Sequence, residues 1–172
     1  MIKLVLGGAR SGKSALAERI AAASPELVTY FATAVGDDAD PDLAERIARH
    51  RDRRPPAWET VEIAFGGNLV GELQACEGAV LVDSLGIWLA GFPDFALEHA
   101  SLTAALLARR AAGHLTVLVS DEAGLGVHPS TYVGRQFRDA LGDLNQAVAA
   151  IADDVWLAVA GRALLLPTEP SL

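Results

Sequence analysis

Short apolar runs alternate with amphipathic segments along most of the chain. Five runs have the length and composition of buried strands and cover residues 2–6, 27–33, 79–83, 115–120 and 155–160. Between them, apolar residues at helical spacing predict helices over 14–23, 42–54, 101–112 and 132–152. Strands that are apolar on both faces are typical of a parallel sheet buried between helices. The pattern therefore predicts an α/β fold with a mostly parallel sheet and helices on both faces.

The length and the absence of internal boundaries indicate one domain. The chain has 172 residues, which is enough for a single well-buried core. It contains no repeat, no low-complexity block and no linker. We expect one domain over residues 1–172.

The acidic composition of the chain disfavours some classes of binding partner. Asp and Glu outnumber Lys and Arg by 22 to 14, which gives a formal net charge of −8. Such a charge disfavours binding to nucleic acid or to an anionic membrane surface. No apolar run is long enough to span a membrane, and the single Cys76 cannot form an internal disulfide. We expect a cytoplasmic protein without an integral membrane segment.

The first apolar run leads into a glycine-rich turn with the spacing G-x-x-x-x-G-K-[ST], called the phosphate loop below. Its residues are Gly7, Gly8, Ala9, Arg10, Ser11, Gly12, Lys13 and Ser14. In such a loop, backbone N–H groups and a helix N-terminus surround a phosphate. Lys13 would reach the β- and γ-phosphates, and the Ser14 hydroxyl would bind Mg²⁺. A strand before the motif and a helix after it favour a nucleoside triphosphate site over an ordinary glycine turn.

Asp83 is the candidate second ligand for Mg²⁺. It follows four apolar residues and so would lie at the carboxyl edge of the sheet, where open α/β folds bind ligands. A structural alternative is that Asp83 caps a helix that begins near Leu85. The two roles are compatible.

Arginines gather around His50 in the segment 44–54. At helical spacing, Arg46, Arg53 and Arg54 share the face of His50. These cations could complement a helix C-terminus, because Pro55 ends the helix. They could also bind a triphosphate as solvated side chains and favour a neutral, nucleophilic imidazole. The residues alone leave both roles open.

Several motifs occur together in one order along the chain. They are GGARSGKS at 7–14, YFAT at 30–33, RIARHR at 46–51, VDSLGIWL at 82–89, EAGLG at 122–126 and FRDALGDLNQ at 137–146. The set resembles the bifunctional adenosylcobinamide kinase and adenosylcobinamide-phosphate guanylyltransferase family of cobalamin (vitamin B12) biosynthesis. The resemblance extends over about residues 1–161, and the histidine within the basic segment makes it specific.

The resemblance implies a P-loop fold and two reactions. Members phosphorylate adenosylcobinamide with ATP or GTP, and then attach GMP from GTP to adenosylcobinamide phosphate through a guanylylated histidine. The matching histidine is His50, and Lys13 is the matching catalytic lysine. Mg²⁺ and a homo-oligomer, a trimer in the family, are implied as well. Beyond the phosphate loop, the implied nucleotide contacts are Thr33, Ala34, Val35, Arg51, Asp52, Arg53, Arg54, Glu62, Asp83 and Ser84.

Some features leave the interpretation open. Asp121 stands where the family usually has an asparagine, and the segment 122–126 could form either a turn or a substrate loop. Arg138 and Asp139 are better explained as a surface pair than as catalytic groups. Two alternative functions remain: a small-molecule kinase without guanylyl transfer, and a regulatory module that binds a nucleoside triphosphate.

Overall fold

The structure is a computed structural model that describes residues 1–33 and 54–168. Most of the predicted helix 42–54 therefore lies outside the described residues. The same holds for six predicted site residues, which are Ala34, Val35, His50, Arg51, Asp52 and Arg53.

The described residues form a seven-stranded sheet in the order β3-β2-β4-β5-β1-β6-β7. All neighbouring strands are parallel except β6 and β7, which form an antiparallel pair. The strands are β1 (Ile2–Gly7), β2 (Val28–Ala32), β3 (Glu59–Glu62), β4 (Ala79–Asp83), β5 (Thr116–Asp121), β6 (Asp154–Val159) and β7 (Arg162–Leu166). The prediction of a mostly parallel α/β sheet is confirmed.

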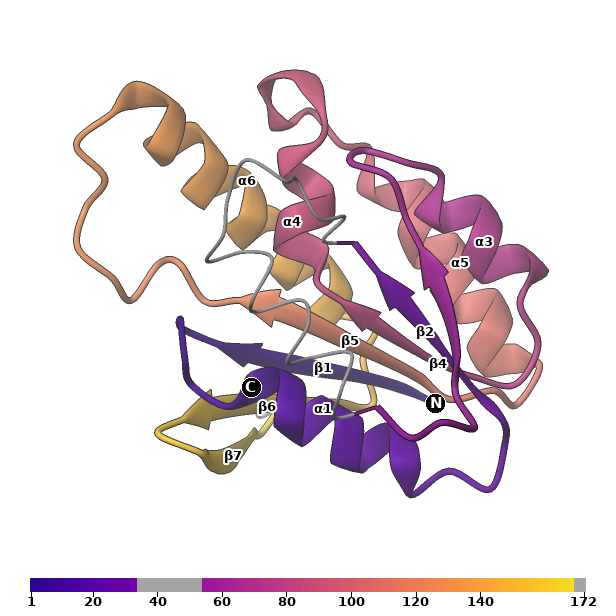
Figure 1. Ribbon diagram of the computed structural model, residues 1–172. Coiled ribbons are helices and arrows are strands. Elements are labelled where there is room, and N and C mark those ends of the chain that lie inside the picture. The colour runs from indigo at the N-terminus through magenta and orange to yellow at the C-terminus, as the bar shows by residue number, and fades with distance from the viewer. Residues whose placement is uncertain (34–53, 169–172) are drawn as a thin grey trace.

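Helices cover both faces of the sheet, as Figure 1 shows. Helix α1 (Lys13–Ala22) lies on one face. The opposite face carries α3 (Leu69–Ala75), α4 (Leu85–Ala90), the 3-10 turn η1 (Pro93–Phe95), α5 (His99–Ala111) and α6 (Tyr132–Ala149). The core is divided accordingly, with a small apolar cluster under α1 and a larger one, including Trp88, on the other side. This two-sided burial explains why the central strands are apolar on both faces.

The elements that the pattern did not predict lie mostly at the margins of the sheet. Strand β3 is an edge strand whose residues are largely exposed. Because it contains the charged residues Glu59 and Glu62, its sequence lacks the apolar run by which the central strands were predicted. Strand β7 is the opposite edge, and most of it is exposed too. Helix α3 has only seven residues, too few for a helical period to stand out. The long helix α6 ends at Ala149, three residues earlier than predicted.

The strand order brings polar residues to one edge. In register, Gly7 at the end of β1 lies opposite Asp121 at the end of β5. Asp83 ends the next strand, β4, beside β5. Thr33 follows the strand after that, β2, and Glu62 ends its neighbour β3. The carboxyl edge of the parallel strands therefore gathers the described part of the predicted site.

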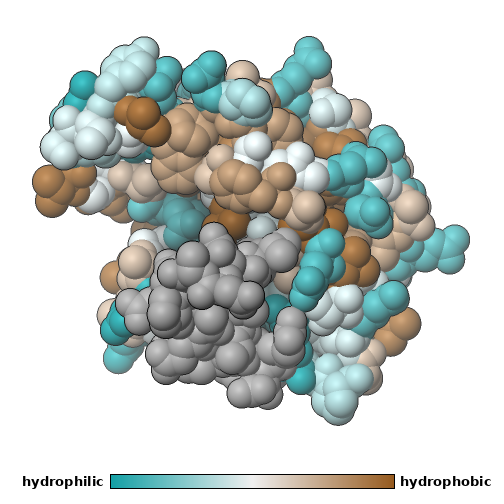
Figure 2. All heavy atoms as spheres, turned by 45° about the horizontal axis from the view of Figure 1, so that its top comes forward, coloured by the Kyte–Doolittle hydropathy of each residue, from teal (hydrophilic) through white to brown (hydrophobic). Residues whose placement is uncertain are grey.

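The surface carries exposed apolar side chains in the segment after β5 and at the start of α6. Leu125, Val127, Tyr132 and Val133 are each more than half exposed. Figure 2 shows apolar atoms at the left margin of the molecule, on the side where Figure 1 places the segment between β5 and α6. No helix in residues 1–33 or 54–168 combines the length and apolar character needed to cross a bilayer.

Candidate nucleotide-binding site

The phosphate loop has a shape that only glycine permits at two positions. A Cβ atom on Gly7 would lie 2.4 Å from the Ser11 hydroxyl oxygen and 2.8 Å from the Ala158 carbonyl oxygen. Gly12 has a φ of +93°, a conformation that other residues rarely adopt. The Ser11 N–H donates to the Gly8 carbonyl at 3.3 Å and closes the turn. The loop leads directly into α1, so the helix N-terminus faces the space that the loop encloses.

The β6–β7 hairpin supports this loop from outside. The N–H of Gly161, in the hairpin turn, donates to the Ser11 carbonyl at 2.9 Å. A Cβ atom on Gly12 would lie 3.2 Å from the Gly161 Cα atom, so the two backbones are in close contact. The loop that was predicted to hold phosphate is thus fixed by a strand pair at the other end of the chain.

Lys13 makes two contacts at the mouth of the loop. Its Nζ donates to the Gly8 carbonyl at 3.2 Å and forms an ion pair with Asp121 Oδ1 at 2.7 Å. The Lys13 side chain is 12% exposed, and that of Asp121 is 38% exposed. Sequence reasoning noted Asp121 only as a departure from the family. Like Asp83, Asp121 follows an apolar run in the sequence, and this pattern could have identified it as a candidate site residue.

Asp83 is held by the neighbouring strand. The Tyr30 hydroxyl, on β2, donates to Asp83 Oδ2 at 2.8 Å. Burial first, and then the charge of Asp83, raise the pKa of Tyr30 far above its usual range, so the hydroxyl keeps its proton and acts as the donor. The residue that caps α4 is Ser84, whose Oγ accepts from the Ile87 N–H at 3.5 Å. The alternative in which Asp83 caps this helix is therefore wrong.

Thr33 is bonded to the backbone at the end of β4. Its buried hydroxyl accepts from the Ser84 N–H at 2.7 Å and donates to the Ser84 carbonyl at 2.8 Å. The peptide bond between Asp83 and Ser84 is cis. Thr33 thus fixes the backbone that follows Asp83. Its nucleotide contact, like that of Ser84, stays a prediction.

Arg54 is not the solvated side chain that the sequence suggested. Its guanidinium carbon lies 3.5 Å from the centroid of the Tyr30 ring, a cation–π contact. Its Nη1 donates to Thr60 Oγ1 at 3.2 Å. Arg54 therefore sits on the same tyrosine that orients Asp83, and this places the end of the basic segment beside the candidate metal ligand.

The predicted Mg²⁺ ligands have suitable chemistry. The Ser14 hydroxyl and the Asp83 carboxylate supply oxygen donors, which Mg²⁺ prefers. In the described ranges, no three His, Cys, Asp or Glu side chains cluster as a metal-binding group. Mg²⁺ in nucleotide sites usually binds one or two protein oxygens together with water and phosphate, so a sparse protein ligand set fits this ion.

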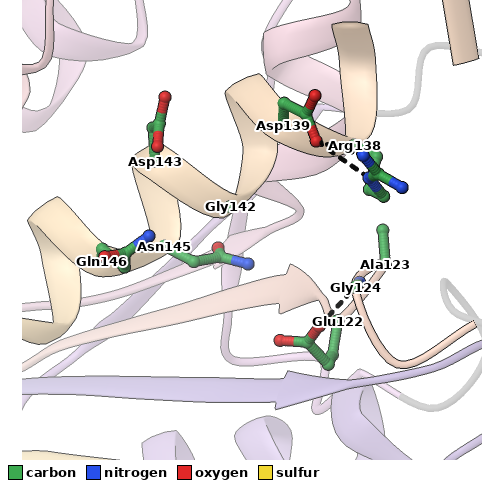
Figure 3. A pocket seen from close by; sticks show the side chains of 9 residues that line it. All are labelled: Glu122, Ala123, Gly124, Arg138, Asp139, Gly142, Asp143, Asn145 and Gln146. Atoms are coloured by element: carbon green, nitrogen blue, oxygen red, sulfur yellow. Dashed lines mark hydrogen bonds and ion pairs between the residues drawn. The ribbon is translucent and has the colours of Figure 1, made fainter. Parts of the chain in front are cut away.

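A cavity of about 330 Å³ lies between α6 and the segment that follows β5 (Figure 3). We call it the α6 cavity. Its lining residues are Glu122, Ala123, Gly124, Arg138, Asp139, Gly142, Asp143, Asn145 and Gln146. The Glu122 N–H donates to the Gly7 carbonyl at 3.1 Å, which joins the cavity wall to the start of the phosphate loop. Both motifs that line the cavity, 122–126 and 137–146, were visible in the sequence, but their meeting was not.

Comparison with known proteins fits this geometry. The model of the cobinamide kinase / cobinamide phosphate guanyltransferase family matches residues 3–166. The chain belongs to this family. The resemblance inferred from the ordered motifs is thereby confirmed.

Members of the family with curated names resemble the chain over nearly their whole length. The bifunctional adenosylcobalamin biosynthesis protein CobP of Pseudomonas aeruginosa is 42% identical, with 99% of each chain covered. The bifunctional adenosylcobalamin biosynthesis proteins CobU of Salmonella typhimurium and Escherichia coli are 36% and 35% identical, with 94% of this chain and 97% of each relative covered.

A more distant likeness concerns the fold alone. A solved structure described as a prototypical ATPase from the type III secretion system of pathogenic bacteria matches with a TM-score of 0.55 and 14% identity. The match covers 91% of this cobinamide kinase-family chain and 50% of the ATPase chain. It agrees with a P-loop type of α/β fold.

Proposed function

We propose that the protein phosphorylates adenosylcobinamide with ATP or GTP and then transfers GMP from GTP to adenosylcobinamide phosphate. Family membership supports both reactions. The observation that carries the proposal on this chain is the phosphate loop, whose glycines and Lys13 have the form of a triphosphate site.

In the kinase step, the chain's own residues bind and orient the triphosphate. Backbone N–H groups of the loop and the start of α1 receive the phosphate oxygens. Lys13 stabilises the negative charge on the γ-phosphoryl group as it moves to the substrate hydroxyl. Ser14 and Asp83 are the proposed ligands of Mg²⁺, which when bound neutralises charge on the phosphates. Tyr30 orients the Asp83 carboxylate.

In the guanylyltransferase step, His50 is the proposed nucleophile. Its imidazole attacks the α-phosphorus of GTP, pyrophosphate leaves, and a protein–GMP phosphoramidate remains. The phosphate of adenosylcobinamide phosphate then attacks the same phosphorus, and His50 is released. The basic side chains Arg51, Arg53 and Arg54 are proposed to bind GTP, with Asp52 among the neighbouring contacts. The position of Arg54 over the ring of Tyr30, which donates to Asp83, supports a role of Arg54 at the same sheet edge as Asp83.

Radiolabelled GTP tests the second step. With Mg²⁺ and α-labelled GTP, the denatured protein should retain label in an acid-labile, alkali-stable bond. Label in the γ-phosphate should not be retained. His50→Asn should remove this label, while phosphorylation of cobinamide persists at least in part because it depends on other residues. Retention of α-label by His50→Asn would exclude His50 as the nucleophile.

The unmodified protein separates this proposal from simpler functions. Phosphorylation of cobinamide without a protein–GMP adduct would leave a small-molecule kinase. Nucleotide binding without turnover of cobinamide would favour a regulatory module. The family resemblance also supports a homo-oligomer, proposed as a trimer, in the cytoplasm. Analytical ultracentrifugation measures the oligomeric state directly.

A further inference from the structure

We propose that the α6 cavity binds the hydroxyl-bearing arm of the cobinamide substrate and presents it to the phosphate loop. This inference rests on the kinase function proposed above, because it assigns that reaction's acceptor to a place on the chain. It adds a binding site, built from α6 and the segment after β5, to the nucleotide site.

The location of the cavity is the first argument. Asp121, which pairs with Lys13, is followed directly by Glu122 of the cavity wall. The Glu122 N–H is bonded to Gly7, the first residue of the phosphate loop. In Figure 3 the end of β1 lies beside Glu122. A group held in the cavity would thus lie next to the end of a triphosphate bound in the loop.

The charge of the cavity argues against a phosphate ligand. Its lining contains the three carboxylates of Glu122, Asp139 and Asp143, and one cation, Arg138. Arg138 is already paired with Asp139 at 2.7 Å, and its Nη1 lies 2.8 Å from the His128 ring nitrogen Nδ1. An anionic nucleotide would be repelled here, whereas a neutral or cationic group bearing hydroxyls and amides would be accepted.

A buried carboxamide in the cavity wall also points to a ligand. The Asn145 side chain, 7% exposed, donates through Nδ2 to the Asp121 carbonyl at 3.0 Å. Its Oδ1 is buried and has no hydrogen-bond partner in the described structure. Figure 3 shows this side chain reaching from α6 toward the segment with Ala123 and Gly124. An acceptor oxygen kept without a donor is costly unless a ligand N–H or O–H completes it.

The size of the cavity limits what enters. A volume of about 330 Å³ is at the small end of ligand sites, so it admits one side arm and leaves the corrin macrocycle outside. Cobinamide's aminopropanol arm carries an amide and a hydroxyl, the groups that Asn145 and Glu122 can bond. The segment beyond Gly124 exposes Leu125 and Val127, which offers apolar surface to the macrocycle.

The same geometry gives Glu122 a role in the transfer. Its Oε1 accepts from the Gly124 N–H at 2.7 Å, which fixes the carboxylate in the wall. As the acceptor oxygen bonds to the γ-phosphorus, the bond from that phosphorus to the bridging oxygen breaks, and the nucleoside diphosphate leaves with the electron pair. The hydroxyl proton passes to Glu122 and then to water. The product arm is now anionic, and the carboxylates expel it from the cavity.

Gly142 allows the cavity to be filled without disturbing the fold. A Cβ atom there would meet no other atom within 4 Å, and its φ is not in the left-handed region. Gly142→Leu therefore places a side chain in the cavity from a helix position at which leucine is favoured over glycine. Ala104→Leu, at an exposed position of α5, is the matched control.

The experiment measures the KM for cobinamide and the binding of nucleotide separately. Gly142→Leu should raise the KM for cobinamide about tenfold or more, since an overfilled site costs roughly that factor in binding. Gly142→Ala should have a smaller effect, and Ala104→Leu none. Nucleotide binding and α-label retention from GTP should be unchanged in all three variants. Asp143→Asn, an exposed cavity residue, should increase affinity for cobinamide phosphate more than for cobinamide.

Each outcome has one meaning. Wild-type KM and cobinamide binding in a folded Gly142→Leu protein would overturn the cavity assignment while leaving the proposed function intact. Should Gly142→Leu fail to fold, unchanged discrimination by Asp143→Asn would overturn it. If the wild-type protein does not phosphorylate cobinamide at all, the proposed function fails and this inference fails with it.

Discussion

Asp83 and Asp121 end two neighbouring parallel strands, yet their carboxylates meet different partners. Asp83 accepts a hydrogen bond from the neutral Tyr30 hydroxyl. Asp121 forms an ion pair with Lys13 of the phosphate loop. The Tyr30 hydroxyl orients the Asp83 carboxylate, whereas the Lys13 ammonium group also offsets much of the charge of Asp121. Position at the end of a strand therefore does not by itself decide which aspartate is the candidate metal ligand.

The two aspartates also lie in different surroundings at one sheet edge. On the Asp83 side, the Tyr30 hydroxyl fixes the orientation of the Asp83 carboxylate, and the Arg54 guanidinium lies over the Tyr30 ring. On the Asp121 side, the carboxylate pairs with Lys13 at the mouth of the loop, and the chain continues into Glu122 and the α6 cavity. Four variants test this division.

Lys13→Ala should have the largest effect. It removes the cation aimed at the phosphates, and loss of one such stabilising group typically lowers kcat by about 100-fold or more. The fold should remain, because the side chain packs in no apolar cluster. Steady-state phosphorylation of cobinamide and a thermal melt measure the two effects. Turnover near the wild-type rate would remove Lys13 from the mechanism.

Asp83→Asn and Tyr30→Phe should reduce activity in that order. The first removes the proposed Mg²⁺ ligand itself. The second removes only the hydroxyl that orients it, and changes to such supporting partners typically cost about 10- to 100-fold in metal affinity or activity. Activity titrated against Mg²⁺ should show a raised requirement in both variants. An unaltered Mg²⁺ dependence in Asp83→Asn would make Asp83 a structural residue.

Asp121→Asn should have the smallest effect, and of opposite sign. An incoming triphosphate must take Lys13 from Asp121, and partly exposed ion pairs contribute at most about 1 kcal/mol. Nucleotide binding should therefore tighten about two- to fivefold at low salt. The gain should shrink as salt screens the pair. Asparagine has nearly the same shape as aspartate, so the variant keeps the close packing against Gly86. A Cβ atom on Gly86 would lie 3.0 Å from Asp121 Oδ2. Weaker nucleotide binding would instead mean that Asp121 positions Lys13 for the phosphates.

Much of the fold could be predicted from the sequence because the central strands are buried on both faces. The runs at 2–6, 79–83 and 115–120 became β1, β4 and β5 almost residue for residue. The edge strands β3 and β7 lack that burial, so their residues do not show a strand pattern. The phosphate loop was predictable for a different reason, since its conformation requires glycine at fixed spacing.

The contacts between side chains within the site could not be predicted from the sequence. The bond from Tyr30 to Asp83 joins β2 to β4, and the Lys13–Asp121 pair joins α1 to β5. Both depend on the order of strands in the sheet, which local pattern does not specify. The α6 cavity likewise needs two separate motifs to face each other across α6 and the end of β5.

The support of the phosphate loop by the β6–β7 hairpin bears on how the protein is made. Strand β1 is synthesised early, but its two neighbours in the sheet are β5 and β6. The backbone contact from Gly161 to Ser11 comes later still. During synthesis on the ribosome, the phosphate loop therefore gains these supporting contacts only after nearly all of the domain has been made. Under the proposed function, a chain that ends before β6 and β7 should therefore gain less stability from a bound nucleoside triphosphate than the full chain does.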